Sequence, residues 1–339
     1  MFQYRFSVII PTYNRLDEIQ ELLISLEKQT LPRDAFEVII VDDGSTDDTE
    51  KFIQGIIQKG SLKLSFYKQD HKGPGPARNT GMKHARGEYY IFVDSDCIAQ
   101  ENWLKAYDEA LTKPVAGFGG PDRVRADFSP LQKAIDYSMT SFLTTGGIRG
   151  SSKRKISKYY PRSFNMGVHA DIVKKIGGFG TLRHGQDIEF THRIRSQGET
   201  IKVMEAVVYH KRRTSLWRFF KQVYNWGVAR INLYKIDKDM LEPVHFFPFF
   251  GTLLIIAFLV CLAIWPGVLW PFLLAGIGVF LLMAVHGIFK YRDIRVFFYI
   301  PFIVPIQILG YGLGFGGALF RRVLFSGKEK TGFSKNYYK

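Results

Sequence analysis

Two carboxylates stand one residue apart after an apolar run: Asp94 and Asp96 follow residues 90–93 (YIFV). Along an extended chain, residues i and i+2 project to one face, so these carboxylates can point the same way. Two close acids repel each other, and burying either one without a partner is costly. Paired oxygen ligands suit Mg²⁺ or Mn²⁺, which commonly stay partly coordinated by substrate phosphates. An isolated D-x-D pattern is more often a solvated turn, so the surrounding sequence must decide.

The elements that must position this pair alternate between strand and helix patterns. Apolar, β-branched runs predict strands, and apolar residues at helical spacing or helix-start residues predict helices. The expected strands are residues 7–10, 36–41, 62–67 and 89–93, and the expected helices are residues 16–29, 47–59 and 77–85. This alternation predicts an α/β fold with a mostly parallel, Rossmann-like sheet flanked by helices.

Polar motifs follow three of the expected strands. They are Pro11-Thr12-Tyr13-Asn14, Asp42-Asp43 and Asp94-Ser95-Asp96. In open parallel sheets, ligands bind at the carboxyl ends of the strands. We therefore expect one functional site at this edge of the sheet.

The composition changes sharply at Phe246. Residues 246–265 and 266–289 contain no Asp, Glu, Lys or Arg. A helix rising about 1.5 Å per residue needs roughly 20 apolar residues to cross the hydrocarbon core, and both runs reach this length. The prediction is a membrane hairpin of two helices, 246–265 and 267–289, that turns at Trp265-Pro266-Gly267.

A third uncharged run, residues 297–320, is less regular. It carries Pro301, Pro305 and five glycines, and Lys/Arg residues flank both of its ends. Since such flanks prefer the cytoplasm, a full crossing would place one of them outside. A spanning helix and a re-entrant or interfacial helix both remain open. The expected regions are therefore a soluble domain (1–212), an amphipathic interfacial linker helix (213–245), a membrane domain (246–325) and a basic tail (326–339).

The chain is strongly basic, with a formal net charge of +15 over 339 residues. The bases cluster at residues 149–162, at 211–221 and beside the apolar runs, where each gains about 1 kcal/mol near anionic lipid. We expect a lipid bilayer and phosphate-bearing substrates as partners and no nucleic acid; a merely soluble basic surface is the alternative. The chain start has no signal-peptide layout, so a multi-pass membrane protein with residues 1–212 in the cytoplasm is expected. Cys97 and Cys261 give no disulfide framework.

An ordered series of motifs covers roughly residues 5–212. It reads SVIIPTYNR, VIIVDDGSTDDT, GPARNTG, YYIFVDSDC, FGGPDRVR, SFNMGVHAD and GGFGTLRHGQDIEFTHRIRSQG. The series resembles the inverting family 2 glycosyltransferases, which have an A-type nucleotide-sugar-binding fold. The resemblance implies a nucleotide-diphosphate sugar donor, a divalent metal (Mn²⁺ or Mg²⁺) and inversion at the anomeric carbon.

The resemblance also assigns donor-binding roles to residues of this chain. Those that would line the nucleoside pocket are Pro11, Thr12, Asn14 and Asp42. Asp42 would accept a hydrogen bond from the base or the ribose. Arg78, expected in a loop spanning residues 73–79, would approach the base or the diphosphate. The glycines and prolines of that segment are equally typical of an ordinary turn.

A metal site is implied by the same resemblance. Asp94 would touch the ribose or the metal, and Asp96 would bind the metal that bridges the diphosphate. His210 follows an apolar, strand-like run and would complete the site, because neutral imidazole is a competent ligand. A lone His after a strand is otherwise more often structural.

An inverting transfer needs a base on the face opposite the leaving group. The family supplies it from an Asp in an xED motif before a helix, and the matching residue here is Asp187, with Gln186 where Glu is usual. This departure leaves the assignment of Asp187 in place but could alter donor contacts. The alternative role for Asp187 is to favour a helix start, where acids are common.

Residues 222–226 (QVYNW) resemble a degenerate QxxRW element of the processive family members. Asn225 replaces the Arg, which argues against long-chain processive synthesis. The surrounding segment mixes aromatic and basic residues, as does a helix lying in a membrane interface.

The implied activity is that of a membrane-anchored, metal-dependent, inverting glycosyltransferase of the hexosyltransferase class, acting in polysaccharide biosynthesis. The donor would be a nucleotide-diphosphate sugar, with UDP expected from its frequency in the family. The acceptor would be a hydroxyl of a lipid-linked saccharide or surface glycan. One alternative is a polyprenyl-phosphate sugar synthase, whose phosphate acceptor needs no base; the segment around Asp187 argues against it. The other is a non-catalytic nucleotide-sugar-binding membrane scaffold, against which the intact acids argue.

Overall fold

The computed structural model describes residues 2–145, 159–329 and 332–333. The chain divides into two compact units. Unit 1 comprises Met1–Arg123, Tyr159–Leu182 and Gln186–Lys211, and unit 2 comprises Val124–Lys158, Arg183–Gly185 and Arg212–Lys339. Most of the expected basic cluster at 149–162 and most of the expected basic tail lie outside the described residues.

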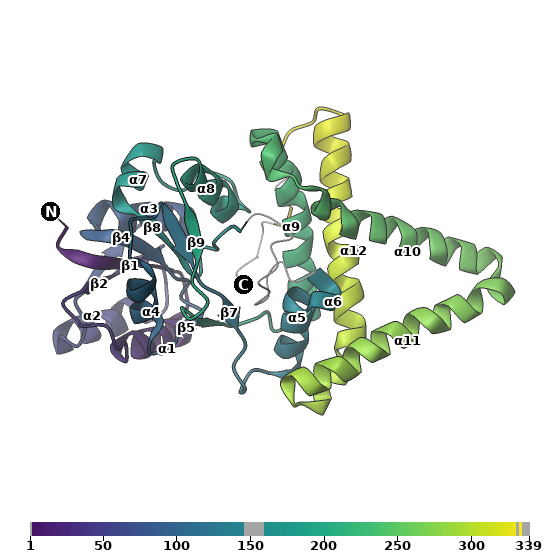
Figure 1. Cartoon of the computed structure of the whole chain (residues 1–339), viewed down its shortest axis with the longest axis horizontal. Coiled ribbons are helices and arrows are strands. Elements are labelled where there is room, and N and C mark those ends of the chain that lie inside the picture. Colours follow the sequence, from purple (N-terminus) through teal and green to yellow (C-terminus); the bar gives the residue numbers. More distant parts are fainter. Residues whose placement is uncertain (1, 146–158, 330–331, 334–339) are drawn as a thin grey trace. The chain divides into compact units, whose positions relative to one another are not determined.

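Unit 1 is built on a seven-stranded sheet with the strand order β3-β2-β1-β4-β8-β6-β9 (Figure 1). The strands are β1 (Tyr4–Thr12), β2 (Phe36–Asp42), β3 (Leu64–Lys68), β4 (Gly87–Phe92), β6 (Gly117–Gly119), β8 (Met166–His169) and β9 (Thr200–Lys202). All neighbouring strands are parallel except that β8 runs antiparallel to both β4 and β6. The predicted α/β fold with a mostly parallel sheet is therefore confirmed.

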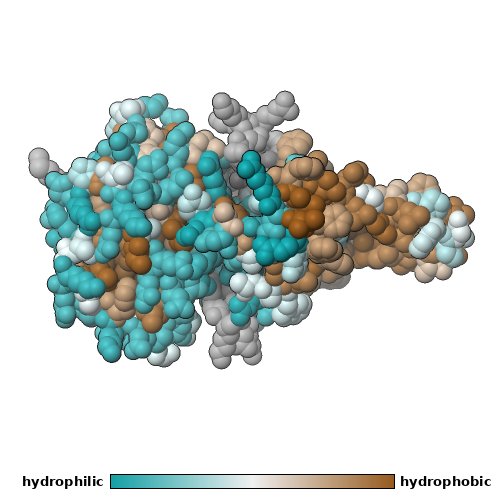
Figure 2. All heavy atoms as spheres, turned by 90° about the horizontal axis from the view of Figure 1, so that it is seen from below, coloured by the Kyte–Doolittle hydropathy of each residue, from teal (hydrophilic) through white to brown (hydrophobic). Residues whose placement is uncertain are grey.

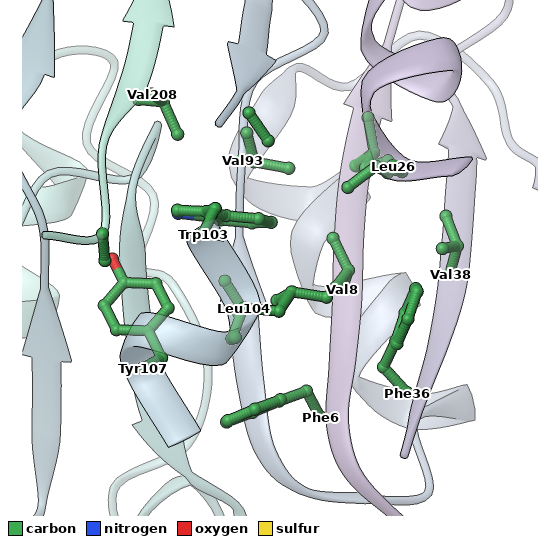
Figure 3. Close-up of a cluster of buried hydrophobic side chains, with 14 of the residues drawn as sticks. Phe6, Val8, Leu26, Phe36, Val38, Val93, Trp103, Leu104, Tyr107 and Val208 are labelled. Carbon is green, nitrogen blue, oxygen red and sulfur yellow. The ribbon is translucent and has the colours of Figure 1, made fainter. Parts of the chain in front are cut away.

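Helices cover both faces of this sheet. Those packed on one face are α1 (Leu16–Glu27), α2 (Thr49–Lys59) and α4 (Trp103–Ala110), and those on the other are α3 (Pro74–His84), α7 (Ala170–Ile176) and α8 (Gln186–Arg195). Because side chains alternate along a strand, Phe6 and Val8 of β1 enter the first core beside Trp103, whereas Ile9 enters the second (Figure 3). This two-sided burial explains why the strands read as continuous apolar runs.

The strand order reverses between β1 and β4, and the chain places its polar motifs there. The chain runs outward from β1 to β2 and β3, then returns to pair β4 with the other side of β1, with Ile9 opposite Phe92. Such a reversal leaves a crevice outside the carboxyl ends of the two central strands. Thr12 ends β1, and Asp94 and Asp96 follow β4.

A second, three-stranded sheet continues from this edge. It consists of β5 (Cys97–Ala99), β10 (Val208–His210) and β7 (Asp122–Arg123). β10 pairs antiparallel with β5, and His210 lies opposite Cys97. This pairing brings His210 beside Asp96 although more than a hundred residues separate them in the chain.

Arg78 lies in helix α3, as the helix expected at residues 77–85 has it, so the loop expected at residues 73–79 is wrong. The helix begins at Pro74, and Gly73 before it has φ +97°. Proline is tolerated in the first turn of a helix because the N–H groups there have no intrahelical partner. The prolines that suggested a turn therefore start the helix.

Unit 2 contains the apolar helices. Its elements are α5 (Pro130–Thr140), α6 (Phe142–Thr145), α9 (Leu216–Ile236), η1 (Lys238–Met240), η2 (Pro243–Phe246), α10 (Phe247–Ile264), α11 (Pro266–Tyr291), η3 (Ile294–Phe298), α12 (Ile300–Leu319) and η4 (Phe320–Leu324). Three of its helices, spanning Pro243–Ile264, Pro266–Tyr291 and Ile300–Leu324, are long and apolar enough to cross a membrane. α10 and α11 form a hairpin, and most of their side chains are apolar and exposed (Figure 2).

Helix α12 differs from the hairpin because nearly half of it is buried within unit 2. Its glycines let neighbouring helices approach on two sides: a Cβ on Gly310 would lie 2.6 Å from Val223 of α9, and one on Gly316 would lie 2.6 Å from Phe249 of α10. Its first residue, Ile300, packs against Gly287 of α11. α12 therefore runs parallel to α9 and bridges the open end of the α10–α11 hairpin (Figure 1).

Buried ion pairs tie α5 into unit 2. Arg212 Nη2 lies 2.7 Å from Asp136 Oδ1, and the Tyr291 hydroxyl donates to Asp136 Oδ2 at 2.6 Å. One turn earlier, Lys133 Nζ lies 2.9 Å from Asp293 Oδ2. These contacts explain why the segment containing α5 clusters with the apolar helices rather than with the sheet.

Candidate active site

The loops after β1 and β2 are tied together by short polar side chains. Asn14, which has φ +49°, accepts a hydrogen bond from Thr46 N at 2.7 Å, and its own N–H donates to Ser45 Oγ at 2.8 Å. Ser45 N donates to both carboxylate oxygens of Asp42, and the Ser45 hydroxyl donates to Asp42 as well. Asp42 is fully buried, and burial raises the pKa of its carboxyl while the hydrogen bonds from Ser45 oppose the rise.

Asp43, a buried neighbour that sequence reasoning did not single out, organises the approach to α3. Its carboxylate accepts hydrogen bonds from Lys72 N at 2.9 Å and from Gly73 N at 2.7 Å. His71 Nδ1 lies 2.9 Å from the same carboxylate, and its ring stacks on Tyr13 at a centroid distance of 4.1 Å. Asp42, the last residue of β2, and Asp43, the first residue after it, thus order the loop after β2 and the loop that precedes α3.

Arg78 is buried and forms an ion pair with Asp94. Its guanidinium also lies over the ring of Phe179, 5.3 Å from the centroid. Two buried polar atoms of this region, Arg78 Nε and Thr12 Oγ1, have no hydrogen-bond partner in the part of the chain that the structure describes. Because buried polar groups are nearly always paired in native proteins, a ligand is a natural partner for both.

Asp96 has different side-chain partners from Asp94. Arg15 Nη1 lies 3.0 Å from Asp96 Oδ2, and His210 Nε2 lies 3.3 Å from Asp96 Oδ1. The two acids, which were expected to share one cation, are therefore separately paired in the structure.

One group of residues among those described has the geometry of a metal site. Ligand atoms of Asp96, Cys97 and His210 all lie within 4.8 Å of one another. Carboxylate oxygen suits Mn²⁺ or Mg²⁺, and imidazole is a common metal ligand. The Cys97 thiol is fully buried, which raises its pKa, and it donates to the carbonyl oxygen of Phe164 at 3.8 Å. Asp96 and His210 are therefore the better-suited ligands, and Asp94, which was also expected at the metal, is not in this group.

Asp187 lies in the first turn of α8, with about one fifth of its side chain exposed. Its Oδ2 is 3.3 Å from Arg162 Nη1, and its Oδ1 accepts from Ile188 N at 3.0 Å. An acid at this position also interacts favourably with the helix dipole. One carboxylate oxygen is thus held by an arginine, and the side chain keeps an exposed edge that an acceptor could reach.

Gln186 joins the helix that carries Asp187 to the helix that carries Arg78. Its Nε2 donates to the carbonyl of Gly180 at 3.1 Å, and a Cβ added to Gly75 would lie 2.6 Å from its Oε1. The N-termini of α3 and α8 therefore touch. The start of a helix, where N–H groups lack intrahelical partners, suits an anionic ligand.

Sequence reasoning missed Arg15 and Arg162, and it noted Asp43 only as part of the Asp42-Asp43 motif without giving it a role. Asp43 had a local signal, since it is the second acid of a pair directly after a strand. Arg15 and Arg162 had none, because their partners lie 81 and 25 residues away in the chain.

Comparison with known proteins decides the family. The model of the family described as Glycosyl transferase family 2 matches residues 7–177, about half of the chain. The chain belongs to glycosyl transferase family 2. The matched region of this glycosyltransferase contains Asp42, Arg78 and the two acids after β4, and it ends before Asp187 and His210.

Several relatives of this glycosyltransferase are known by name. Glycosyltransferase AglE of Haloferax volcanii is 27% identical over 242 residues, which is 70% of this chain and 77% of AglE. The poly(ribitol-phosphate) β-N-acetylglucosaminyltransferase TarS of Staphylococcus aureus is 46% identical over 101 residues, or 30% of this chain. The matched part spans only 18% of TarS.

A solved structure covers most of the glycosyltransferase. Mannosyltransferase PcManGT of Pyrobaculum calidifontis, in complex with GDP-Man and Mn²⁺, superposes with a TM-score of 0.64 over 91% of this chain and 88% of PcManGT. At 19% sequence identity, the likeness shows the fold alone. The A-type glycosyltransferase fold expected from the motifs is thereby confirmed.

Proposed function

We propose that this glycosyltransferase is anchored in a membrane and transfers a sugar, with inversion, from a nucleotide-diphosphate sugar to a hydroxyl of a lipid-linked saccharide or surface glycan. One observation carries the proposal: the crevice at the carboxyl ends of β1 and β4 gathers Asp94 with Arg78 and Asp96 with His210. The helix start bearing Asp187 adjoins the helix start bearing Arg78.

The donor end of the site is formed by residues at the carboxyl ends of β1 and β2 and just after them. Pro11, Thr12, Asn14 and Asp42 line the proposed nucleoside pocket. Thr12 Oγ1 and Arg78 Nε are buried and lack protein partners among the described residues, so they can bind the nucleotide without breaking existing hydrogen bonds. UDP is the proposed nucleotide. The complex of PcManGT with GDP-Man supports a nucleotide sugar as the ligand class.

A divalent cation, Mn²⁺ or Mg²⁺, fits the donor set of Asp96 and His210, with Asp94 as the proposed third contact. When bound, it would supply charge neutralisation for the departing diphosphate. The presence of Mn²⁺ beside GDP-Man in the PcManGT complex supports this class of cofactor. Arg78, at the start of α3, binds the same anionic group from the protein side.

The candidate base for the proposed inverting step is Asp187. The acceptor oxygen forms a bond to the anomeric carbon while the bond from that carbon to the diphosphate oxygen breaks. The hydroxyl proton passes to the carboxylate of Asp187. Arg162 holds the other side of this carboxylate and thereby orients it.

The membrane region is proposed to cross the bilayer twice, through α10 and α11. Because α12 bridges the open end of this hairpin, we propose that it lies along the membrane surface rather than across it. Both Lys/Arg-rich flanks of α12 then remain on the cytoplasmic side, as such flanks prefer. The proposed division is a cytoplasmic catalytic domain (1–212), an interfacial linker (213–245), a membrane domain (246–325) and a basic tail (326–339).

A thermal-shift measurement on the detergent-solubilised protein tests the proposed donor site. Nucleoside diphosphates (UDP, GDP, ADP, CDP) are compared with and without Mn²⁺. We expect one of them to stabilise the protein only with Mn²⁺, and Asp96→Asn to abolish the effect. Asp34→Asn, which changes an exposed acid at the other end of the sheet, is the matched control and should behave as wild type. Stabilisation that needs no cation, or that survives in Asp96→Asn, would contradict the proposal.

A further inference from the structure

The backbone of His210, a proposed ligand of the divalent cation, is fixed by its neighbouring strand. The antiparallel pairing of β10 with β5 places His210 opposite Cys97, and Lys211 N donates to the carbonyl of Asp96 at 3.1 Å. The ring is less constrained. Its Nε2 lies 3.3 Å from Asp96 Oδ1, whereas Nδ1 is buried and has no hydrogen-bond partner among the residues that the structure describes.

A histidine that binds a metal usually has a hydrogen bond at its second ring nitrogen. That nitrogen donates to a carboxylate, a backbone carbonyl or a water, and the contact fixes the orientation of the ring. Changing the partner residue typically weakens metal binding by about 10–100-fold. In His210, a different kind of contact has to keep Nε2 directed at Asp96.

The ring of Phe164 provides this contact. The centroids of the Phe164 and His210 rings lie 4.6 Å apart, and the ring planes are inclined by 39°. Favourable aromatic pairs have centroid distances of about 4.5–7 Å. The carbonyl oxygen of Phe164 also accepts a hydrogen bond from Cys97 Sγ at 3.8 Å. Phe164 therefore contacts both members of the cross-strand pair, His210 through its ring and Cys97 through its carbonyl.

The residue that follows this phenylalanine is anchored by its entire amide group. Asn165 is fully buried, and its Oδ1 accepts hydrogen bonds from Trp103 Nε1 at 2.8 Å and from the Tyr107 hydroxyl at 2.5 Å, both on α4 (Figure 3). Its Nδ2 donates to the carbonyls of Pro121 at 3.2 Å and Ala206 at 2.9 Å. An amide has two acceptor sites and two donor hydrogens, so all four are used. This anchor fixes the backbone from which the phenylalanine ring projects.

We propose that Phe164 is a positioning residue for the cation site: its ring, in place of a hydrogen bond at Nδ1, holds the imidazole of His210 with Nε2 toward Asp96. This inference rests on the proposed function, because it takes Asp96 and His210 as ligands of the cation. Phe164 does not touch the cation and acts through the imidazole. A ring that already faces the site loses little rotational freedom when the cation binds, so the affinity is higher.

The experiment has to separate this role from ordinary packing. Phe164 is partly buried and packs against the first core of unit 1, so its removal lowers stability in either case. The affinity for Mn²⁺ is therefore the measured quantity, and a double-mutant cycle with His210 shows whether the effect passes through the imidazole.

Isothermal titration of Mn²⁺ into the detergent-solubilised, nucleotide-free protein is carried out on wild type, Phe164→Ala, His210→Ala and the double variant. We expect Phe164→Ala to bind Mn²⁺ about tenfold more weakly than wild type, as does loss of other contacts that orient a ligand histidine. His210→Ala should also weaken binding, and weak binding remains measurable because Asp96 is still present. Adding Phe164→Ala to His210→Ala should cause no further loss, because there is no imidazole left to position.

Phe66→Ala is the matched control, since Phe66 of β3 is another partly buried phenylalanine that packs against the same core. It should leave the affinity for Mn²⁺ unchanged. If His210→Ala weakens binding and Phe164→Ala does not, the positioning role alone is overturned. A loss of about tenfold that Phe164→Ala also causes in the His210→Ala background overturns it as well. If wild type binds no Mn²⁺, or His210→Ala binds it as wild type does, the cation site of the proposed function fails and this inference fails with it.

Discussion

Arg15 and Asp96 form an ion pair of 3.0 Å between Nη1 and Oδ2, joining the residue before α1 to the second acid after β4. His210 faces the other oxygen of the same carboxylate. The carboxylate proposed to hold a divalent cation is therefore already partnered on both oxygens. A cation that binds there has to displace Arg15, since the imidazole can remain as a ligand.

Removing the Arg15 charge is expected to tighten Mn²⁺ binding. In Arg15→Gln the cation no longer competes with a guanidinium for Asp96, and the local positive charge falls by one. Partly exposed ion pairs of this kind contribute up to about 1 kcal/mol, so the affinity should rise by roughly fivefold. Isothermal titration of Mn²⁺ into nucleotide-free protein measures the change.

Arg86→Gln is the control for this measurement, because Arg86 is exposed and precedes β4, at the opposite end of the strand from the acids. It should leave Mn²⁺ binding unchanged. Weaker Mn²⁺ binding in Arg15→Gln would mean that Arg15 supports the cation site instead of competing for it.

Asp187→Asn is expected to remove transfer while keeping donor binding. General base catalysis contributes about 10²–10⁴-fold, and an amide cannot take the acceptor proton. The cation-dependent thermal shift by the nucleotide should persist, because Asp187 makes no proposed contact with the nucleoside. Radiolabelled sugar transfer to membrane extracts measures the first quantity.

A specific result of the Asp187→Asn assay would favour the polyprenyl-phosphate synthase instead. A phosphate acceptor is already ionised and needs no base. If mass spectrometry shows sugar on bare polyprenyl phosphate at an undiminished rate in Asp187→Asn, the base assignment fails.

Strands β1, β2 and β4 could be predicted from the sequence because the patterns that mark them are local. Apolar, β-branched runs closed by polar motifs mark β1, β2 and β4, and the acids after them fall at the switch point that the strand order creates. Arg78 was placed at the right end of the sheet, but the loop expected there is wrong, since the prolines before Arg78 start the helix earlier than residue 77.

The rest of the candidate site and the make-up of unit 2 depend on long-range contacts that no local sequence pattern encodes. His210 reaches Asp96 only through the pairing of β10 with β5, and Arg15 reaches it across the crevice. The segment containing α5 joins the apolar helices through Asp136 and Arg212, 76 residues apart. The spacing of the glycines in α12, in contrast, is a local pattern that matches its packing. Gly310 and Gly314 face α9, and Gly312 and Gly316 face α10.

Asp136→Ala is expected to destabilise unit 2 strongly. The variant leaves the buried Arg212 guanidinium without its carboxylate, and breaking a buried pair in this way costs about 3–5 kcal/mol. Loss of the hydrogen bond from Tyr291 adds to the effect. Thermal inactivation in detergent measures the loss. The control is Asp127→Ala, which breaks an exposed ion pair with Arg125 and should lower the stability by less than about 1 kcal/mol. Equal losses of stability in the two variants would contradict the proposed role of the buried network.

The proposed placement of α12 along the membrane surface predicts the sidedness of three exposed positions: Gly267 at the hairpin tip, Arg292 before α12 and Lys328 after it. Single cysteines are introduced at each position in a Cys261→Ser background, where the remaining Cys97 is fully buried. A membrane-impermeant maleimide applied to sealed vesicles then reports which side each cysteine faces.

If α10 and α11 cross the bilayer and α12 does not, positions 292 and 328 label from one side and position 267 from the other. If α12 crosses as well, position 328 labels together with position 267. The packing of α12 favours the first labelling pattern. Its C-terminal half packs against α10 and its first turn packs against α11, so it contacts a different helix of the hairpin at each end. A helix that crossed the bilayer beside the hairpin would not be expected to do this. Labelling of 267 and 328 from the same side would therefore refute a two-crossing anchor.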